Sequence, residues 1–211
     1  MDAKSLITTI DKGVASARND HLLWTDGSWL TAYGVESLVV ARIATEIMEH
    51  KKKPARLTME TSINEIEQIS GQRHIGRRSI YQKPNNRIDI ALLNRTNITH
   101  TIEVKRFWSP ACGTDIMRLS HMSNLLKNTT SYKFGVFVML IEAAKRSKNA
   151  SSESVLKAAY ASAIANSTPY LKEASRKYSI SYSFHEGLEQ YVHDDDYGVC
   201  SSLCIKIKAN N

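Results

Sequence analysis

The stretch RIDIALLNRTNITHTIEVKRF, residues 87–107, contains two apolar segments that both carry charged side chains. Asp89 lies in the first segment, and Glu103 and Lys105 form an E-x-K pattern in the second. Both segments are rich in aliphatic and β-branched residues, and the short polar sequence NRTN joins them, so we predict a β-hairpin. Because carboxylate and ammonium groups are costly to desolvate, charges in such strands require a functional explanation.

Successive side chains of a strand point to opposite faces, so Glu103 and Lys105 share one face and Asp89 points away from its apolar neighbours. An antiparallel hairpin then places the two carboxylates near the same end of the sheet. Mg²⁺ prefers oxygen ligands and keeps waters, which predicts Asp89 and Glu103 as its ligands, with Mn²⁺ as a substitute. Lys105 would orient or help to deprotonate the attacking water, or stabilise transition-state charge. A fortuitous salt bridge on a half-exposed sheet is the alternative interpretation.

A third carboxylate begins the sequence of a predicted helix, YGVESLVVARIATEIMEH, residues 33–50. Glu36 precedes four aliphatic residues at intervals of 3, 4, 7 and 11, namely Val39, Val40, Ile43 and Ile47. It therefore lies at the N-terminal end of a stripe that should face the core. Either Glu36 reaches toward the same metal ion, or it faces solvent on a broad amphipathic helix.

The rest of the chain alternates between helical and extended patterns. We expect a strand at 57–62, a helical turn at 64–70, a helix that Thr114 caps, a strand at 132–142, a helix at 151–167, a short helix opened by Pro169, and edge strands at 179–186 and 202–209. This order predicts an α/β fold with a mixed central sheet and helices on both faces. The length of 211 residues predicts one domain, with a core at about 33–142 and an α/β extension at about 150–209.

Positive charge is concentrated in one part of the chain. Residues 42–106 hold thirteen Lys and Arg against seven Asp and Glu, which accounts for six of the net seven positive charges. A local basic excess favours a polyphosphate-binding surface. The candidate phosphate-contacting residues are Lys51, Lys52, Lys53, Arg73, Arg77 and Arg78. A solvated basic face without a partner is the alternative.

Several functional classes receive no support from the sequence. The three cysteines, Cys112, Cys200 and Cys204, form no disulfide framework, and neither a signal peptide nor a membrane-spanning apolar run is visible, which predicts a cytoplasmic protein. The pattern of a phosphate-binding loop for ATP is missing as well. The tryptophans Trp24, Trp29 and Trp108 could stack on bases, or they could serve packing.

The motifs GVES, RIDIAL and IEVKR resemble those of the PD-(D/E)XK, or restriction-endonuclease-like, nuclease superfamily over about residues 33–142. The resemblance implies a core in the order helix, three strands, helix, strand. It also implies that Asp89 and Glu103 bind metal, that Lys105 is the catalytic lysine, and that Glu36 is the accessory acid on the helix. Ile88 stands where the superfamily usually has proline, and Glu60 is an alternative third carboxylate.

These observations lead to a functional prediction: a Mg²⁺-dependent DNA endonuclease with double-stranded DNA as substrate. We expect a homodimer that uses residues 150–209 as its contact surface, and either modest intrinsic sequence specificity or a partner protein that supplies targeting, as in a defence, repair or mobile-element system. The alternative is a catalytically silent nuclease fold that binds nucleic acid or protein.

Overall fold

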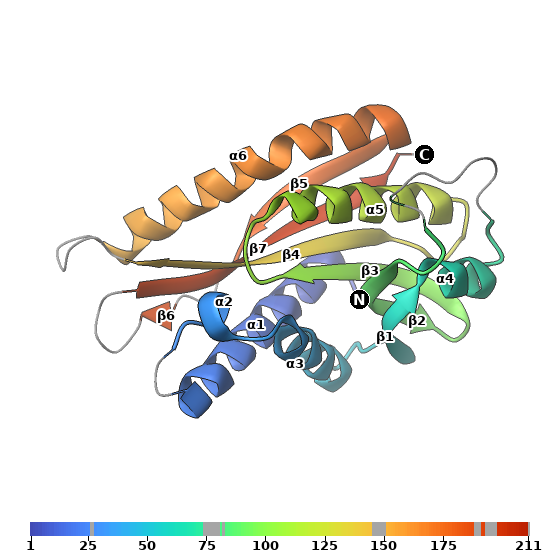
Figure 1. Ribbon diagram of the computed structural model, residues 1–211. Coiled ribbons are helices and arrows are strands. Elements are labelled where there is room, and N and C mark those ends of the chain that lie inside the picture. Colours follow the sequence, from blue (N-terminus) through green and yellow to red (C-terminus); the bar gives the residue numbers. More distant parts are fainter. Residues whose placement is uncertain are drawn as a thin grey trace.

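A mixed β-sheet with helices on both faces forms the centre of the molecule (Figure 1), as predicted from the sequence. The computed structural model describes residues 1–25, 28–73, 81, 83–144, 151–187, 191–192 and 198–210. Its described strands form a seven-stranded sheet in the order β1-β2-β3-β4-β7-β5, with β6 paired to β7. The strands are β1 (Arg56–Ser62), β2 (Arg87–Asn94), β3 (Asn97–Lys105), β4 (Phe134–Ala144), β5 (Ile180–Glu186), β6 (Tyr191–Val192) and β7 (Gly198–Ala209). Only β3 and β4 pair in parallel; the other described pairs are antiparallel.

The helices divide between the two faces of the sheet. In Figure 1, α5 (Pro110–Leu126) and α6 (Ser152–Tyr178) lie above it, and α1 (Ala3–Thr25), α2 (Leu30–Tyr33) and α3 (Glu36–Glu49) lie below it. The short α4 (Ile63–Ser70) sits beside β1 and β2. Because side chains alternate along a strand, β4 contributes to a separate apolar core on each face.

The hairpin and the first predicted helix are confirmed. β2 and β3 pair antiparallel with Ile90 opposite Ile102, and the register shifts between Leu92 and Leu93. The predicted helix at 33–50 corresponds to α3, with its aliphatic stripe buried. The turn expected at 64–70 is a full helix, α4, which begins with a capping box formed by Ser62 and Glu65.

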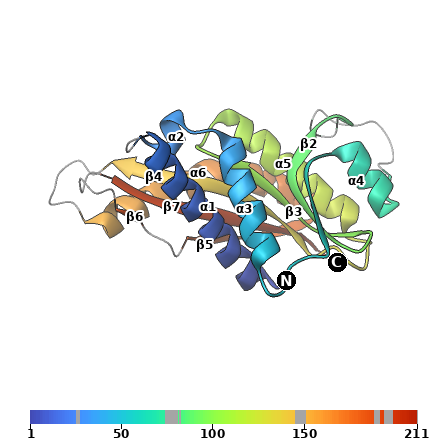
Figure 2. The same ribbon diagram turned by 90° about the horizontal axis from the view of Figure 1, so that it is seen from below.

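An N-terminal helix was not among the predicted elements, although its sequence carries a helical apolar stripe. Leu6, Ile10 and Val14 of α1 are buried against α3, and the two helices run side by side across one face of the sheet (Figure 2). They approach closely at Gly13, where an added Cβ would lie 2.5 Å from the Cα of Ile43. A larger residue at position 13 would therefore force the helices apart.

Two predictions of helix boundaries are wrong. Thr114 does not cap α5: the helix begins at Pro110 after Ser109, because proline fits the first helical position. Pro169 does not open a new helix but lies inside α6, where Ser167 precedes it and Leu171 follows it on one continuous buried face. The hydroxyl groups of Ser167 and Thr168 donate to the carbonyls of Ala163 and Ile164, one turn earlier, as Ser and Thr inside helices often do.

The strand predicted at 202–209 is not an edge strand. β7 lies between β4 and β5, and its first eight residues are all buried. Lys206 and Lys208 create the alternating pattern only at the C-terminal end, where the strand emerges. In the part of the chain that the structure describes, no helix has the length and apolar character needed to cross a membrane.

Candidate active site

The β2–β3 hairpin brings together the charged residues that its sequence singles out. Continuing the register of Ile90 and Ile102 by one residue sets Asp89 across from Glu103. Asp89 is only 9% exposed, and its Oδ2 accepts a hydrogen bond of 2.6 Å from the backbone N–H of Val104. The strand pairing itself therefore fixes the position of this carboxylate.

Glu103 is the most deeply buried acid of the group, with 1% of its surface exposed. Its Oε1 accepts a charged hydrogen bond from Nη2 of Arg118 and lies 3.8 Å from Nζ of Lys105. Its Oε2 is buried and has no hydrogen-bond partner among the residues that the structure describes. A buried polar atom without a partner is unfavourable, so this oxygen calls for a ligand that the described residues do not supply.

Lys105 connects carboxylates that come from three different elements. Its Nζ donates to Oε1 of Glu36 at 2.9 Å, and Oδ2 of Asp115 lies 3.5 Å away. Asp115 is also 2.6 Å from Nη2 of Arg118, three residues later on α5. We call these six residues the charged cluster: Glu36, Asp89, Glu103, Lys105, Asp115 and Arg118.

Asp115 and Arg118 were not predicted as site residues, although one sequence signal points to Asp115. It precedes Leu119, Met122 and Leu126 at intervals of 4, 7 and 11, so it starts a buried stripe as Glu36 does on α3. The place of Arg118 in the site can be recognised only from the folded structure, because its contact with Glu103 depends on how α5 packs on β3.

Burial shifts both hairpin carboxylates toward the neutral form. Desolvation raises the pKa of Asp89 from 3.8 to about 6, although the Val104 N–H and Lys105 oppose the rise. Desolvation also raises the pKa of Glu103 well above its usual value; Asp89 adds to this rise, and Arg118 and Lys105 oppose it. Both groups would gain from a further cation beside them.

The pKa values of the two cationic side chains, Lys105 and Arg118, shift in the direction that keeps them charged. Burial by itself would lower the pKa of Lys105, but Glu103, Glu36, Asp115 and Asp89 outweigh it and raise this pKa above its usual value. Burial alone would likewise lower the pKa of Arg118, but Glu103 above all, and then Asp115 and Asp89, raise it. Lys105 is therefore an ammonium group at neutral pH and cannot accept a proton from water.

The charged cluster can offer a hard divalent cation two carboxylate ligands, but it cannot surround the ion with protein ligands alone. Among the described residues, the charged cluster holds four carboxylates and two cations, so two negative charges remain when all are ionised. No group of three or more His, Cys, Asp and Glu in the described ranges is arranged to hold a metal ion. Mg²⁺ commonly uses only one or two carboxylates, with waters and substrate phosphate completing its shell.

Comparisons with protein-family models, with curated proteins and with solved structures all give no match. The resemblance to PD-(D/E)XK nucleases therefore rests on the three short motifs, and function has to be argued from the chemistry of the charged cluster.

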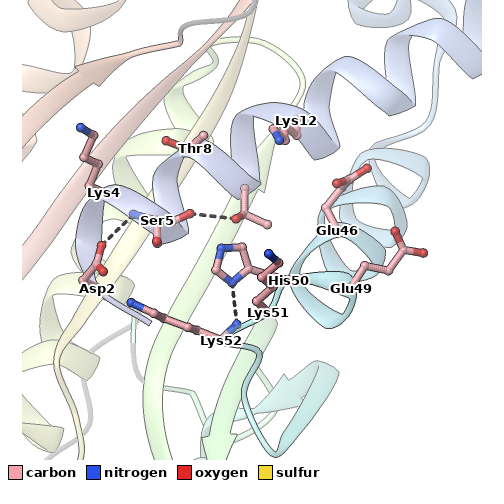
Figure 3. Close-up of a pocket in the computed structure, with 11 residues that line it drawn as sticks. Asp2, Lys4, Ser5, Thr8, Lys12, Glu46, Glu49, His50, Lys51 and Lys52 are labelled. Carbon is pink, nitrogen blue, oxygen red and sulfur yellow. Dashed lines mark hydrogen bonds between the residues drawn. The ribbon is translucent and has the colours of Figure 1, made fainter.

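The lysine run predicted to contact phosphate lies away from the charged cluster. Glu36 begins α3 and Lys51 follows its other end, so about 20 Å separates them along 14 helical residues. Lys51 and Lys52 line a hollow of about 770 Å³ between α1 and the end of α3 (Figure 3). Its lining mixes four lysines with three acids: Lys4, Lys12, Lys51 and Lys52 with Asp2, Glu46 and Glu49. Lys53 is exposed next to it.

The other basic candidates and the alternative acid are placed as follows. Arg73 is exposed after α4, whereas Arg77 and Arg78 lie outside the described residues. Glu60 is exposed on β1, and it forms an ion pair with Arg87, 3.9 Å away, rather than with Lys105. Glu36 is thus the acid that the fold brings into contact with Lys105.

Proposed function

We propose that this protein is a Mg²⁺-dependent endonuclease that hydrolyses phosphodiester bonds of DNA at the charged cluster. The observation that carries the proposal is the convergence of Asp89, Glu103 and Lys105 at one end of the hairpin, with a buried, unpartnered Oε2 on Glu103. Buried groups with strongly shifted pKa values that face one another are typical of catalytic sites.

Each side chain has a role that follows from its surroundings. Asp89 and Glu103 would hold Mg²⁺, with Mn²⁺ as a substitute, and the bound ion would polarise the phosphoryl oxygen and acidify water. Lys105 donates hydrogen bonds to a phosphoryl oxygen and stabilises the negative charge that develops on it. Of the roles expected for Lys105, its raised pKa favours charge stabilisation over deprotonation of water. Glu36 and Asp115 hold its ammonium group in place.

The order of the helices and strands supports a restriction-endonuclease-like core. α3, β1, β2, β3, α5 and β4 follow one another as helix, three strands, helix and strand, the order of the restriction-endonuclease-like core, with α4 inserted after β1. The remaining C-terminal segment, α6 with β5 to β7, then constitutes the α/β extension.

Double-stranded DNA, a homodimer and a targeting partner protein complete the proposal. The basic excess of residues 42–106 suits a duplex, and paired sites would cut both strands. β5 is an edge of the sheet inside the proposed contact region, residues 150–209, and an edge strand can pair with a second copy. Light scattering at micromolar concentration should give a dimer; a monomer both free and with DNA and Mg²⁺ would contradict this.

One observation favours a second function, a catalytically silent nuclease fold that binds nucleic acid or protein. The guanidinium of Arg118 already contacts Oε1 of Glu103, a side chain that is proposed to hold the metal ion. A resident cation at this position could replace the metal ion and leave a stable binding module.

A cleavage assay separates the two functions. Purified protein is incubated with duplex, single-stranded and branched DNA and with RNA, in Mg²⁺, in Mn²⁺ and in EDTA. We expect metal-dependent cleavage of duplex DNA that Asp89→Asn and Glu103→Gln abolish. Glu173→Gln, which changes an exposed acid on α6 outside the charged cluster, is the matched control and should cleave normally. Cleavage that persists in Asp89→Asn would remove the site assignment, and binding without cleavage in any metal would favour the silent module.

A further inference from the structure

A small apolar pocket of about 230 Å³ opens beside the charged cluster. It lies between the sheet and α6, and its lining includes Phe107, Trp108, Met139, Ile141, Ser162 and Asn166. Met139 is the partner of Lys105 in the β3–β4 register, and Phe107 follows Lys105 by two residues. The pocket and the charged cluster therefore share one end of β3.

The segment that follows Lys105 is fixed, yet it leaves an aromatic ring exposed. Nη1 of Arg106 donates to the carbonyls of Leu30 and Thr31, at 3.3 and 3.1 Å. The same guanidinium lies over the Phe107 ring, 5.4 Å from its centre, while 51% of Phe107 remains exposed. The ring is thus held at the pocket without being covered.

Exposed apolar side chains gather around the charged cluster. Among the described residues, the large exposed ones are Leu23, Trp24, Val35, Met59 and Phe107. Three of them adjoin the charged cluster: Val35 precedes Glu36, Met59 pairs with Ile90 next to Asp89, and Phe107 follows Lys105. Of these three residues, Phe107 also lines the pocket.

We infer that this pocket receives one nucleobase of the nucleic acid bound at the charged cluster, stacked on Phe107; the inference rests on the proposed function. At about 230 Å³ the pocket is below the usual range of about 300–1,000 Å³ for whole small-molecule ligands, so a single ring system suits it. Ser162 and Asn166 are exposed on α6 and can offer donors and acceptors to the polar edges of a base.

A base must leave its stack to enter the pocket. This requirement limits which nucleic acids can be substrates. A pocket next to the scissile phosphate can take a base from a single strand, or a base that has rotated out of a duplex. Stacking on an aromatic ring tolerates any base, so the pocket would favour unpaired or distorted sites without reading sequence.

Binding of short single-stranded oligonucleotides in EDTA tests the inference without cleavage. One oligonucleotide carries bases throughout, and a second has the same backbone with abasic sugars. Phe107→Ala should weaken binding of the first by roughly fivefold or more and leave binding of the second unchanged. Phe107→Trp should retain binding of the first. Leu23→Ala, which truncates another exposed apolar side chain that does not line the pocket, is the control and should bind both as the wild type does.

The outcomes separate this inference from the proposed nuclease function. Equal weakening of both oligonucleotides by Phe107→Ala, or no weakening of either, would overturn the base pocket even if duplex DNA is cleaved. Base-dependent weakening in a protein that cleaves nothing would support the pocket and remove the nuclease function. Failure to bind any nucleic acid would overturn both, and the apolar rim would then suit a protein partner.

Discussion

The ammonium group of Lys105 lies 2.9 Å from a carboxylate oxygen of Glu36, although 69 residues separate them in the chain. Glu36 starts a helix on one side of the sheet, and Lys105 ends a strand within it. The side chain of Lys105 also meets Asp115 from the helix on the other side. The position of this one ammonium group therefore depends on both layers of helices.

Lys105→Ala should reduce the rate of cleavage by about 100-fold or more, because it removes a preorganised donor to the developing charge. Metal binding should largely remain, since Asp89 and Glu103 are unchanged. Calorimetric titration with Mg²⁺ measures the second effect, and Lys83→Ala, an exposed lysine, is the control. Metal affinity lost as completely as in Asp89→Asn would argue that Lys105 is structural.

Asp89→Asn should stabilise the metal-free protein at neutral pH and lose this advantage in acid. The pKa of Asp89 is raised from 3.8 to about 6, so between these values the native state binds more protons than the unfolded state. The wild type therefore loses roughly 3 kcal/mol as pH rises through this window. Asparagine can still accept the Val104 hydrogen bond. Urea unfolding in EDTA at pH 4 and pH 7.5 checks the result; an advantage independent of pH would contradict it.

Arg118→Met should destabilise the metal-free protein by about 3–5 kcal/mol, because Glu103 and Asp115 lose a buried cationic partner. Mg²⁺ should then restore more stability to this variant than to the wild type. Unfolding by urea with EDTA and with Mg²⁺ measures both quantities. Arg56→Met, at an exposed position of β1, should change stability by less than about 0.5 kcal/mol. An equal response to Mg²⁺ in Arg118→Met and wild type would show that the guanidinium and the metal do not compete.

Gly13→Ala should destabilise the fold by roughly 1–3 kcal/mol, despite the higher helix propensity of alanine. The new methyl group would meet the backbone of α3 at Ile43. Lys12→Ala, on the exposed side of the same helix, is the matched control. A rise in melting temperature for Gly13→Ala would mean that the two helices can separate freely.

Neutralising Lys51, Lys52 and Lys53 together should weaken DNA binding and reduce its dependence on salt, because fewer counterions are released. Arg73, Arg77 and Arg78 form the second set for the same experiment. The metal affinity of either triple variant should equal that of the wild type. Unchanged salt slopes would assign these residues to a solvated basic face.

The hairpin and its carboxylates could be predicted because their signals are local. Alternation along β2 and β3 and a short polar turn determine which side chains share a face, and the stripe after Glu36 orients that acid. The same stripe rule applies to Asp115. Arg118 could not be found this way, because its role depends on the packing of α5 against β3. The separation between the lysine run and Lys105 could not be predicted either, because it depends on which end of α3 lies beside Lys105 in the folded protein.

Because α3 carries Glu36 at one end and leads to Lys51 at the other, it can serve as a molecular ruler. Phosphates of one strand of B-form DNA repeat every 3.4 Å or so along the axis of the duplex, so its length of about 20 Å corresponds to about six base pairs. A duplex that touches both ends must be at least this long. Affinity plotted against duplex length would then rise in a step near six base pairs, and shortening or extending α3 by one turn would move that step.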